Sequence, residues 1–125
     1  MTAGPEERLL RQILDLAALT GWRAMHIENS TRVIRRRSGA SVRVRNVNVQ
    51  GVGFPDLVLV HAATGRIIFA ELKSDRGSTT PEQKAWLADL SGVEARVTGL
   101  PYCPVIVRVL RPRDWPLIER QLTGQ

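Results

Sequence analysis

The chain has 125 residues, 43% of them hydrophobic, and it carries a formal net charge of +6 with a pI near 11.0. A chain of this length supports one hydrophobic core and is short for a second, so we predict a single domain over residues 1–125. The excess of Lys and Arg favours a polyanionic partner, and nucleic acid is the first candidate.

Cysteine content and hydropathy exclude several other classes. The single cysteine, Cys103, rules out a disulfide framework and a multi-cysteine zinc site within this sequence, and its simplest role is that of a small buried residue. No apolar run approaches the roughly 20 residues of a membrane span, and the polar first residues do not resemble a signal peptide. We therefore expect a cytoplasmic protein with no membrane partner.

The first predicted element is a helix over residues 5–19, because apolar residues recur there at helical spacing and Gly21 supplies a stop. At about 100° per residue, Glu6 projects near the middle of the apolar stripe, whereas Glu7 falls to one side. We therefore expect Glu6 to point inward, although an acidic residue is also simply favourable in the first turn of a helix. A strand over residues 22–27 follows.

Residues 29–55 contain six arginines and no Asp or Glu. Valines at positions 42, 44, 47 and 49 indicate a bulged strand or arm at about residues 29–51, or else a segment that orders only on binding. The arginines form either a solubilising face or a set of contacts to a DNA backbone, and we favour DNA contact. They are Arg32, Arg35, Arg36, Arg37, Arg43 and Arg45.

The segment from Asp56 to Glu71 contains an apolar strand, a turn and a second apolar strand. If Val60 lies opposite Ile67 in an antiparallel hairpin, Asp56 lies opposite Glu71. Side chains in such a pair have Cβ atoms roughly 4.5–5.5 Å apart, where two carboxylates repel each other unless a cation offsets the charge. Lys73 shares the strand face of Glu71, because the two are two residues apart. The spacing therefore predicts a metal site at the open end of this hairpin.

After the hairpin, a loop leads to a helix that is capped by Thr80 and ends near Gly92. A strand over residues 105–110 and a closing helix from its cap at Asp114 to Leu122 complete the chain. The order α-β-β-β-α-β-α predicts an α/β (mixed α+β) fold, in which helices flank a short central mixed β-sheet.

The predicted metal site has the ligands that hard divalent cations prefer. Mg²⁺ takes oxygen ligands, so Asp56 and Glu71 suit it, and the backbone carbonyl of Leu72 could add a third oxygen. A cation there would polarise a phosphoryl group and activate water, while Lys73 orients that water or stabilises charge on the phosphate. Glu6 could contact a second metal ion or reach the site through water.

Three further residues have weaker indications. Gln83 is expected on the inward face of its helix, where it could steady Lys73 or the water, or merely complete a capping box with Thr80. His26 and His61 are isolated in the sequence and lack the spacing of metal ligands. We therefore do not expect either histidine to bind a metal ion.

Three motifs carry a resemblance to a known family. They are Gly53-Phe54-Pro55-Asp56-Leu57, Glu71-Leu72-Lys73-Ser74 and Thr80-Pro81-Glu82-Gln83-Lys84-Ala85-Trp86-Leu87. Together they resemble the VRR-NUC branch of the PD-(D/E)xK nuclease superfamily, in its small stand-alone form known from phages and bacteria. The first helix and the terminal strand and helix are also similar, so the resemblance covers nearly the whole chain except residues 29–51.

The resemblance implies a restriction-endonuclease-like core and a Mg²⁺- or Mn²⁺-dependent endonuclease that hydrolyses phosphodiester bonds in DNA. It implies Asp56 and Glu71 as metal ligands, Lys73 as the catalytic lysine, Glu6 as the helix-borne acid and Gln83 as the motif glutamine. By analogy with stand-alone members, the substrate is branched DNA such as a Holliday junction. A homodimer follows from that substrate, because symmetric incision needs two active sites.

Two alternatives stay open from the sequence. The chain could be a DNA-binding or assembly module that keeps the nuclease fold without turnover, although such a module has no need of paired carboxylates that repel phosphate. RNA is a weaker candidate substrate, since nothing in the sequence indicates recognition of a 2′-hydroxyl. The expected location is the cytoplasm of a bacterial cell or of a phage-infected host.

Overall fold

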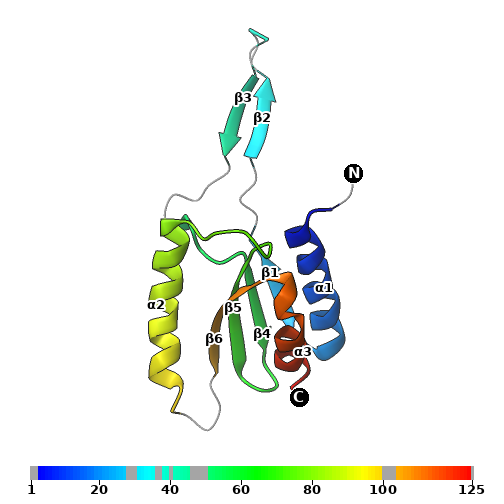
Figure 1. Cartoon of the computed structure of the whole chain (residues 1–125), viewed down its shortest axis with the longest axis vertical. Coiled ribbons are helices and arrows are strands. Elements are labelled where there is room, and N and C mark those ends of the chain that lie inside the picture. The colour runs from blue at the N-terminus through cyan, green and yellow to red at the C-terminus, as the bar shows by residue number, and fades with distance from the viewer. Residues whose placement is uncertain are drawn as a thin grey trace.

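A four-stranded sheet forms the centre of the molecule (Figure 1). The computed structural model describes residues 3–27, 31–35, 38–39, 41–45, 51–99 and 104–124, and for residues 31–35 and 41–45 it describes the backbone. The strand order in the sheet is β1 (Arg23–His26), β4 (Leu57–His61), β5 (Arg66–Leu72) and β6 (Val105–Leu110). The first three strands are antiparallel neighbours, and β6 runs parallel to β5.

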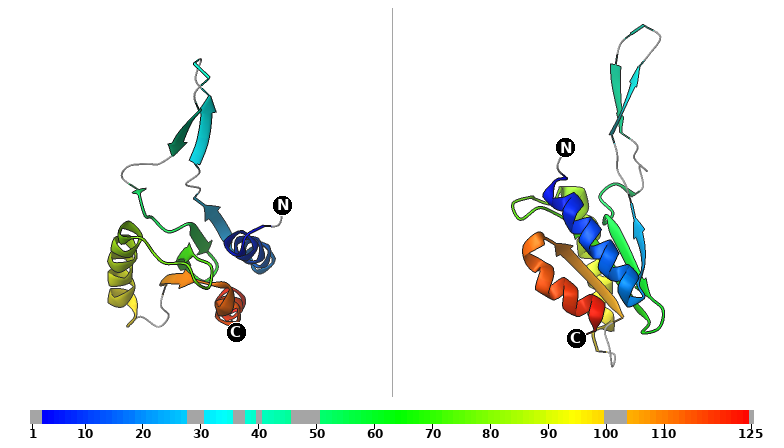
Figure 2. Two further views of the ribbon diagram at one scale, coloured as in Figure 1. Left: turned by 45° about the horizontal axis from the view of Figure 1, so that its top comes forward. Right: turned by 90° about the vertical axis from the view of Figure 1, so that its right-hand side faces the viewer.

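Helices cover both faces of this sheet. One face carries α1 (Pro5–Thr20) and α3 (Trp115–Thr123), while α2 (Pro81–Val97) packs against β6 on the other (Figures 1 and 2). The buried side chains of α1 recur at helical spacing and meet those of α3 and of the sheet in one apolar core. The helical members of this core are Leu9, Ile13, Ala17, Ile118 and Leu122.

The start of β1 is fastened to the end of α3. Gly21, with φ of 84°, ends α1 in the left-handed conformation that glycine adopts without strain. Trp22 then turns into the core, and its indole N–H donates to the carbonyl of Leu122 at 2.9 Å. The guanidinium of Arg66 lies 5.4 Å from the centroid of the Trp22 ring. These contacts join the two helices that share a face of the sheet.

A second hairpin extends away from the body of the molecule (Figures 1 and 2). It consists of β2 (Thr31–Arg35) and β3 (Ser41–Arg45), which are antiparallel and form their own two-stranded sheet. This hairpin lies within the arginine-rich segment of the sequence. Arg36, Arg37, the valines at 47 and 49, and Cys103 lie outside the described residues.

The predicted fold class is confirmed. The mixed sheet, its flanking helices and the order α-β-β-β-α-β-α agree with the sequence analysis once the β2–β3 hairpin is set aside. The predicted strand over residues 105–110 has the bounds of β6. Within the described residues, no helix is both long and apolar enough to cross a membrane.

The predicted end of α2 near Gly92 is wrong, because the helix continues to Val97. Glycine in an exposed helix interior costs only about 1 kcal/mol, and a tertiary contact on the next turn offsets that cost. The Glu94 carboxylate accepts hydrogen bonds from the Val107 N–H at 2.7 Å and from Arg108 at 2.9 Å. The C-terminal half of α2 is thereby joined to the edge strand of the sheet.

The predicted cap position of the last helix, Asp114, is confirmed, but its side chain makes no capping bond. Asp114 ends a short 3₁₀ turn, η2 (Pro112–Asp114), and α3 begins at Trp115. Its carboxylate makes no capping bond to α3 and accepts instead from the N–H of Arg111 at 2.9 Å. The aspartate therefore stabilises the turn that leads from β6 into α3.

Candidate active site

The β4–β5 hairpin has the register that the sequence predicts. Val60 lies opposite Ile67, and continuing this ladder to its open end brings Asp56 beside Glu71. The N–H of Leu72 donates to Oδ2 of Asp56 at 3.1 Å and so orients that carboxylate. Two strands joined by one short turn therefore hold two acidic side chains together at one end of the sheet.

Glu71 is a buried carboxyl group, only 1% exposed. Its pKa is raised from 4.5 to about 8, first because burial removes water from the charged form and second because the Asp56 carboxylate lies beside it. Lys73 opposes this rise with a smaller effect. Within the described residues, Oε2 of Glu71 is the one buried side-chain nitrogen or oxygen without a hydrogen-bond partner. A bound cation, or a proton shared with Asp56, would satisfy such an oxygen.

The other oxygen of Glu71, Oε1, is held by two neighbours. The Gln83 side-chain amide donates to it at 2.8 Å, and the ammonium nitrogen of Lys73 lies 3.8 Å away. The Lys73 side chain is 14% exposed, so this ion pair is largely shielded from solvent. The carboxylate is thus fixed on the Oε1 side, and its Oε2 side is left for another ligand.

Gln83 completes the capping box that was one of its two expected roles, and it also contacts a site residue other than the one expected. Its side-chain oxygen accepts from the Thr80 N–H at 2.8 Å, and the Thr80 hydroxyl accepts from the Gln83 N–H at 3.2 Å, which completes a capping box. Its side-chain nitrogen meanwhile binds Glu71 rather than Lys73. One residue therefore connects the start of α2 to the carboxylate pair.

The segment just before Asp56 packs tightly against the first turns of α2. Gly53 has φ of 85°, and a Cβ atom there would come within 2.7 Å of the Gln83 backbone nitrogen, so no side chain fits without displacing the helix. Phe54 then packs edge-on against Trp86, with ring centroids 5.0 Å apart. These contacts set the position of Asp56 relative to α2, the helix whose Gln83 side chain binds Glu71.

An arginine that the sequence analysis did not single out organises the loop after Lys73. The Lys73 N–H donates to the carbonyl of Leu110 at 3.0 Å, which extends the pairing of β5 with β6. The guanidinium of Arg111 donates to the carbonyls of Ser74 at 2.6 Å and Gly77 at 2.7 Å. Its place directly after β6 was the available signal, because the carboxyl ends of parallel neighbours meet at one edge of a sheet.

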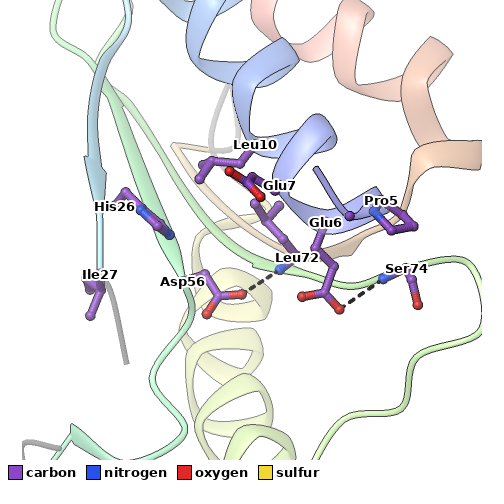
Figure 3. A pocket seen from close by; sticks show the side chains of 10 residues that line it. Pro5, Glu6, Glu7, Leu10, His26, Ile27, Asp56, Leu72 and Ser74 are labelled. Carbon is purple, nitrogen blue, oxygen red and sulfur yellow. Dashed lines mark hydrogen bonds between the residues drawn. The ribbon is translucent and has the colours of Figure 1, made fainter. Parts of the chain in front are cut away.

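A cavity of about 690 Å³ lies between the first turn of α1 and the strand ends (Figure 3). Glu6 lines this cavity and its Oε1 atom accepts from the Ser74 N–H at 3.3 Å, but the expected contrast with Glu7 is absent, because Glu7 lines the cavity too. Asp56 and Leu72 also line the cavity. His26 also lines the cavity, a position that the sequence analysis did not predict.

The residues present form a partial set of oxygen ligands. No group of three or more Asp, Glu, His or Cys side chains in the described part of the chain is arranged to hold a metal ion. Asp56, Glu71 and the carbonyl of Leu72 suit Mg²⁺ or Mn²⁺, since Mg²⁺ usually binds one or two carboxylates together with waters and substrate phosphate. The partnerless Oε2 of Glu71 is the observation that favours such an ion.

The arginine-rich hairpin leaves the sheet near this site. The N–H of Ile27, just after β1, donates to the carbonyl of Asp56 at 2.7 Å, so the chain departs toward β2 beside the carboxylate pair. Four of the six arginines lie on the two strands of the hairpin and the other two lie outside the described residues. The register pairs are Arg32 with Val44, Arg43 with Val33, Arg45 with Thr31 and Arg35 with Ser41.

Comparison with known proteins identifies the family. A family model described as the VRR-NUC domain matches residues 6–100, which is most of the chain and includes all five side chains predicted for the site. No curated protein and no solved structure matches. The matched segment contains the carboxylate pair, Lys73 and the first turns of α1 and α2, while Arg111 lies beyond it. The chain therefore belongs to the VRR-NUC family of nuclease domains.

Proposed function

We propose that the protein is a divalent-metal-dependent endodeoxyribonuclease that hydrolyses phosphodiester bonds in branched DNA. The observation that carries this proposal is the pairing of Asp56 with Glu71, whose buried Oε2 atom has no hydrogen-bond partner while Lys73 lies beside its other oxygen. A site built only for structure would place a donor on that oxygen. A nuclease site has a reason to keep it open for a cation.

Each residue of the site has a separate role in this proposal. Asp56, Glu71 and the carbonyl of Leu72 would hold Mg²⁺ or Mn²⁺, which would supply positive charge at the phosphate and lower the pKa of water. Lys73, oriented by its ion pair with Glu71, aligns the attacking water or stabilises charge on the phosphate oxygens. Glu6 approaches from α1 and acts on a second ion or through water.

Gln83 keeps Glu71 in place from the start of α2. Its hydrogen bond to Oε1 restrains the rotamer of the metal-binding carboxylate, and its capping box restrains its own. Such outer contacts orient first ligands in metal sites. Gln83 is therefore a positioning residue in this proposal.

The arginines of residues 32–45 provide the DNA contacts. The +6 net charge and the extension of the β2–β3 hairpin from the site end of the sheet support a role in holding the phosphate backbone. A four-way junction suits an arm that reaches beyond the body of the enzyme. Symmetric incision of a junction needs two sites, so we propose a homodimer acting in the cytoplasm.

Cleavage assays test this proposal. Purified protein is incubated with a four-way junction, a linear duplex and single strands, in Mg²⁺, in Mn²⁺ and with chelator. We expect metal-dependent cutting with preference for the junction and a dimeric mass by light scattering. RNA of the same junction sequence is expected to stay intact.

A matched pair of lysine variants sharpens the assay. Lys73→Met removes the ammonium beside Glu71, whereas Lys84→Met removes one from an exposed position on α2. Only the first is expected to abolish cleavage, and both are expected to bind DNA. If folded wild-type protein binds DNA and cuts none of these substrates, the protein is a binding module and the enzymatic proposal is wrong.

A further inference from the structure

The two histidines of the chain have different surroundings. The ring of His61 is occupied on both sides, since Nδ1 lies 2.7 Å from the Thr64 hydroxyl and Nε2 lies 3.1 Å from the carbonyl of Thr20. It also packs against Trp22, with centroids 4.9 Å apart. His26 lies at the other end of the sheet, where it lines the cavity beside the carboxylate pair. The position of His26, and not that of His61, therefore allows contact with a substrate of the candidate site.

The backbone fixes where His26 points. It lies opposite Leu57 on the neighbouring strand, and cross-strand partners project to the same face of a sheet. Leu57 is buried in the core formed with α1, so His26 projects toward α1 rather than toward the α2 face. The bond from the Ile27 N–H to the Asp56 carbonyl, at 2.7 Å, ties this end of β1 to the site. Figure 3 shows the imidazole directed into the cavity.

The charge of the cavity lining gives His26 its significance. Three of the described lining residues, Glu6, Glu7 and Asp56, are carboxylates, and His26 is the only one whose side chain can be cationic. A nucleotide phosphate that enters such a cavity meets strong repulsion unless a metal ion and a hydrogen-bond donor face it. An imidazole N–H is a donor in either protonation state.

The size and the remaining lining suit one nucleotide. A volume of about 690 Å³ lies within the usual range for small-ligand sites, roughly 300–1,000 Å³. Pro5, Leu10 and Ile27 contribute apolar surface to the lining. Such surface can contact a deoxyribose ring, while the polar groups face its phosphate.

We propose that this cavity binds the nucleotide adjoining the scissile phosphate, and that His26 donates a hydrogen bond to a phosphate oxygen of that nucleotide. The inference rests on the proposed nuclease function and adds to it a substrate contact on β1. In this proposal His26 contributes to the affinity for the DNA strand. The metal ion would be bound by Asp56, Glu71 and the carbonyl of Leu72.

Binding and kinetics of His26 variants provide the first test. His26→Ala is expected to weaken junction binding in Ca²⁺, used as a probe that occupies the site without supporting rapid cleavage, by roughly 10-fold, the effect of a hydrogen bond to a charged group. In Mg²⁺ its KM rises while kcat stays near the wild-type value. His26→Gln, which keeps an N–H donor, restores part of the affinity.

Met25→Ala is the matched control, because Met25 is the preceding residue of β1, is 65% exposed and projects to the opposite face of the sheet. It is expected to bind and cut as the wild type does. Unfolding midpoints measured for all variants separate loss of fold from loss of contact. Equal binding by His26→Ala and the wild type would overturn the inference.

Single methylphosphonate substitutions along the cut strand provide a decisive second readout. Neutralising the contacted phosphate weakens wild-type binding at one position, and His26→Ala shows no further loss at that position. If each methylphosphonate weakens DNA binding by His26→Ala as much as it weakens binding by the wild type, His26 does not contact phosphate. If the variant instead needs a higher metal concentration for half-maximal activity, it is a metal ligand and the inference is wrong. Failure of the nuclease proposal is distinct, since wild-type protein would then bind DNA without cutting it.

Discussion

The two ends of the β4–β5 hairpin differ in whether their polar side chains have partners within the chain. At the turn end, His61 is bonded to Thr64 and Thr20, and Arg66 donates to the Gln121 carbonyl at 3.3 Å while stacking over Trp22. These groups find partners within the chain, as is usual for structural polar residues.

At the open end, the same two strands carry a like-charge pair. When both are ionised, Asp56 and Glu71 repel each other, and Oε2 of Glu71 has no hydrogen-bond partner although it is buried. Neighbours on Oε1 hold Glu71 in this unfavourable place. The turn end is therefore satisfied by contacts within the chain, whereas the open end keeps an electrostatic cost that a bound cation would relieve.

The largest expected effect comes from breaking the open end. Asp56→Asn removes one charge of the pair and weakens metal binding, so we expect cleavage to fall by at least about 10²–10³-fold, the loss typical of one key electrostatic group. Single-turnover rates on a junction in Mn²⁺ measure it. His61→Gln at the turn end is the control, and it is expected to keep the wild-type rate. Comparable losses in both variants would mean that the two ends do not differ in function.

Breaking the turn end is expected to affect stability instead. Trp22→Ala removes a buried aromatic ring, its bond to Leu122 and its contact with Arg66. We expect the free energy of unfolding to fall by about 3–5 kcal/mol, as for other buried aromatic truncations. Urea titrations measure this change. At a temperature where the variant stays folded, its cleavage rate should match the wild type. A large loss of rate there would contradict the assignment of stability to the turn end and of function to the open end.

A smaller effect concerns the pH dependence of stability. The native pKa of Glu71, about 8, is above its unfolded value, so the native state holds the proton more tightly. Without metal, this contribution is fully present at low pH and declines as pH rises through about 8, by at most about 1.4 kcal/mol per unit. Glu71→Gln removes the decline and can donate its amide to Asp56.

Urea titrations in chelator near pH 5 and near pH 8 measure this difference. We expect the wild type to lose stability between them relative to Glu71→Gln. Mn²⁺ should then raise the unfolding temperature of the wild type and leave the variant almost unchanged, because a ligand stabilises only the state that binds it. Parallel pH profiles without metal would show that the carboxylates are not strained.

The sequence predicted those features of the fold and site that depend on local periodicity. The hairpin register followed from the apolar runs, and it led directly to the pairing of Asp56 with Glu71. The end of α2 was misplaced because a long-range contact, from Glu94 to the N–H of Val107, outweighs the local signal of Gly92. Local patterns carry no information about such contacts.

Residues whose role depends on parallel or edge pairing were missed in the sequence, because finding them requires the strand order as well as the strands. Arg111 reaches the loop after Lys73 only because β6 lies beside β5. His26 reaches the cavity because β1 pairs with β4, across the long arginine-rich insertion. In both cases the connecting segment is long, so spacing along the chain does not indicate proximity.

The smallest expected effect separates the two functions of Gln83. Thr80→Ala and Gln83→Ala both disrupt the capping box of α2, so each should lower the free energy of unfolding by about 1 kcal/mol. Only Gln83→Ala also removes the bond to Oε1 of Glu71. It should therefore raise the Mn²⁺ concentration required for half-maximal cleavage by about 10-fold, which is the scale of lost outer contacts in metal sites. Metal titrations of the cleavage rate, compared between the two variants, measure this difference. If both variants respond alike, the helix cap and not the carboxylate contact is what Gln83 contributes, and the open end of the hairpin is held by Lys73 and Leu72 alone.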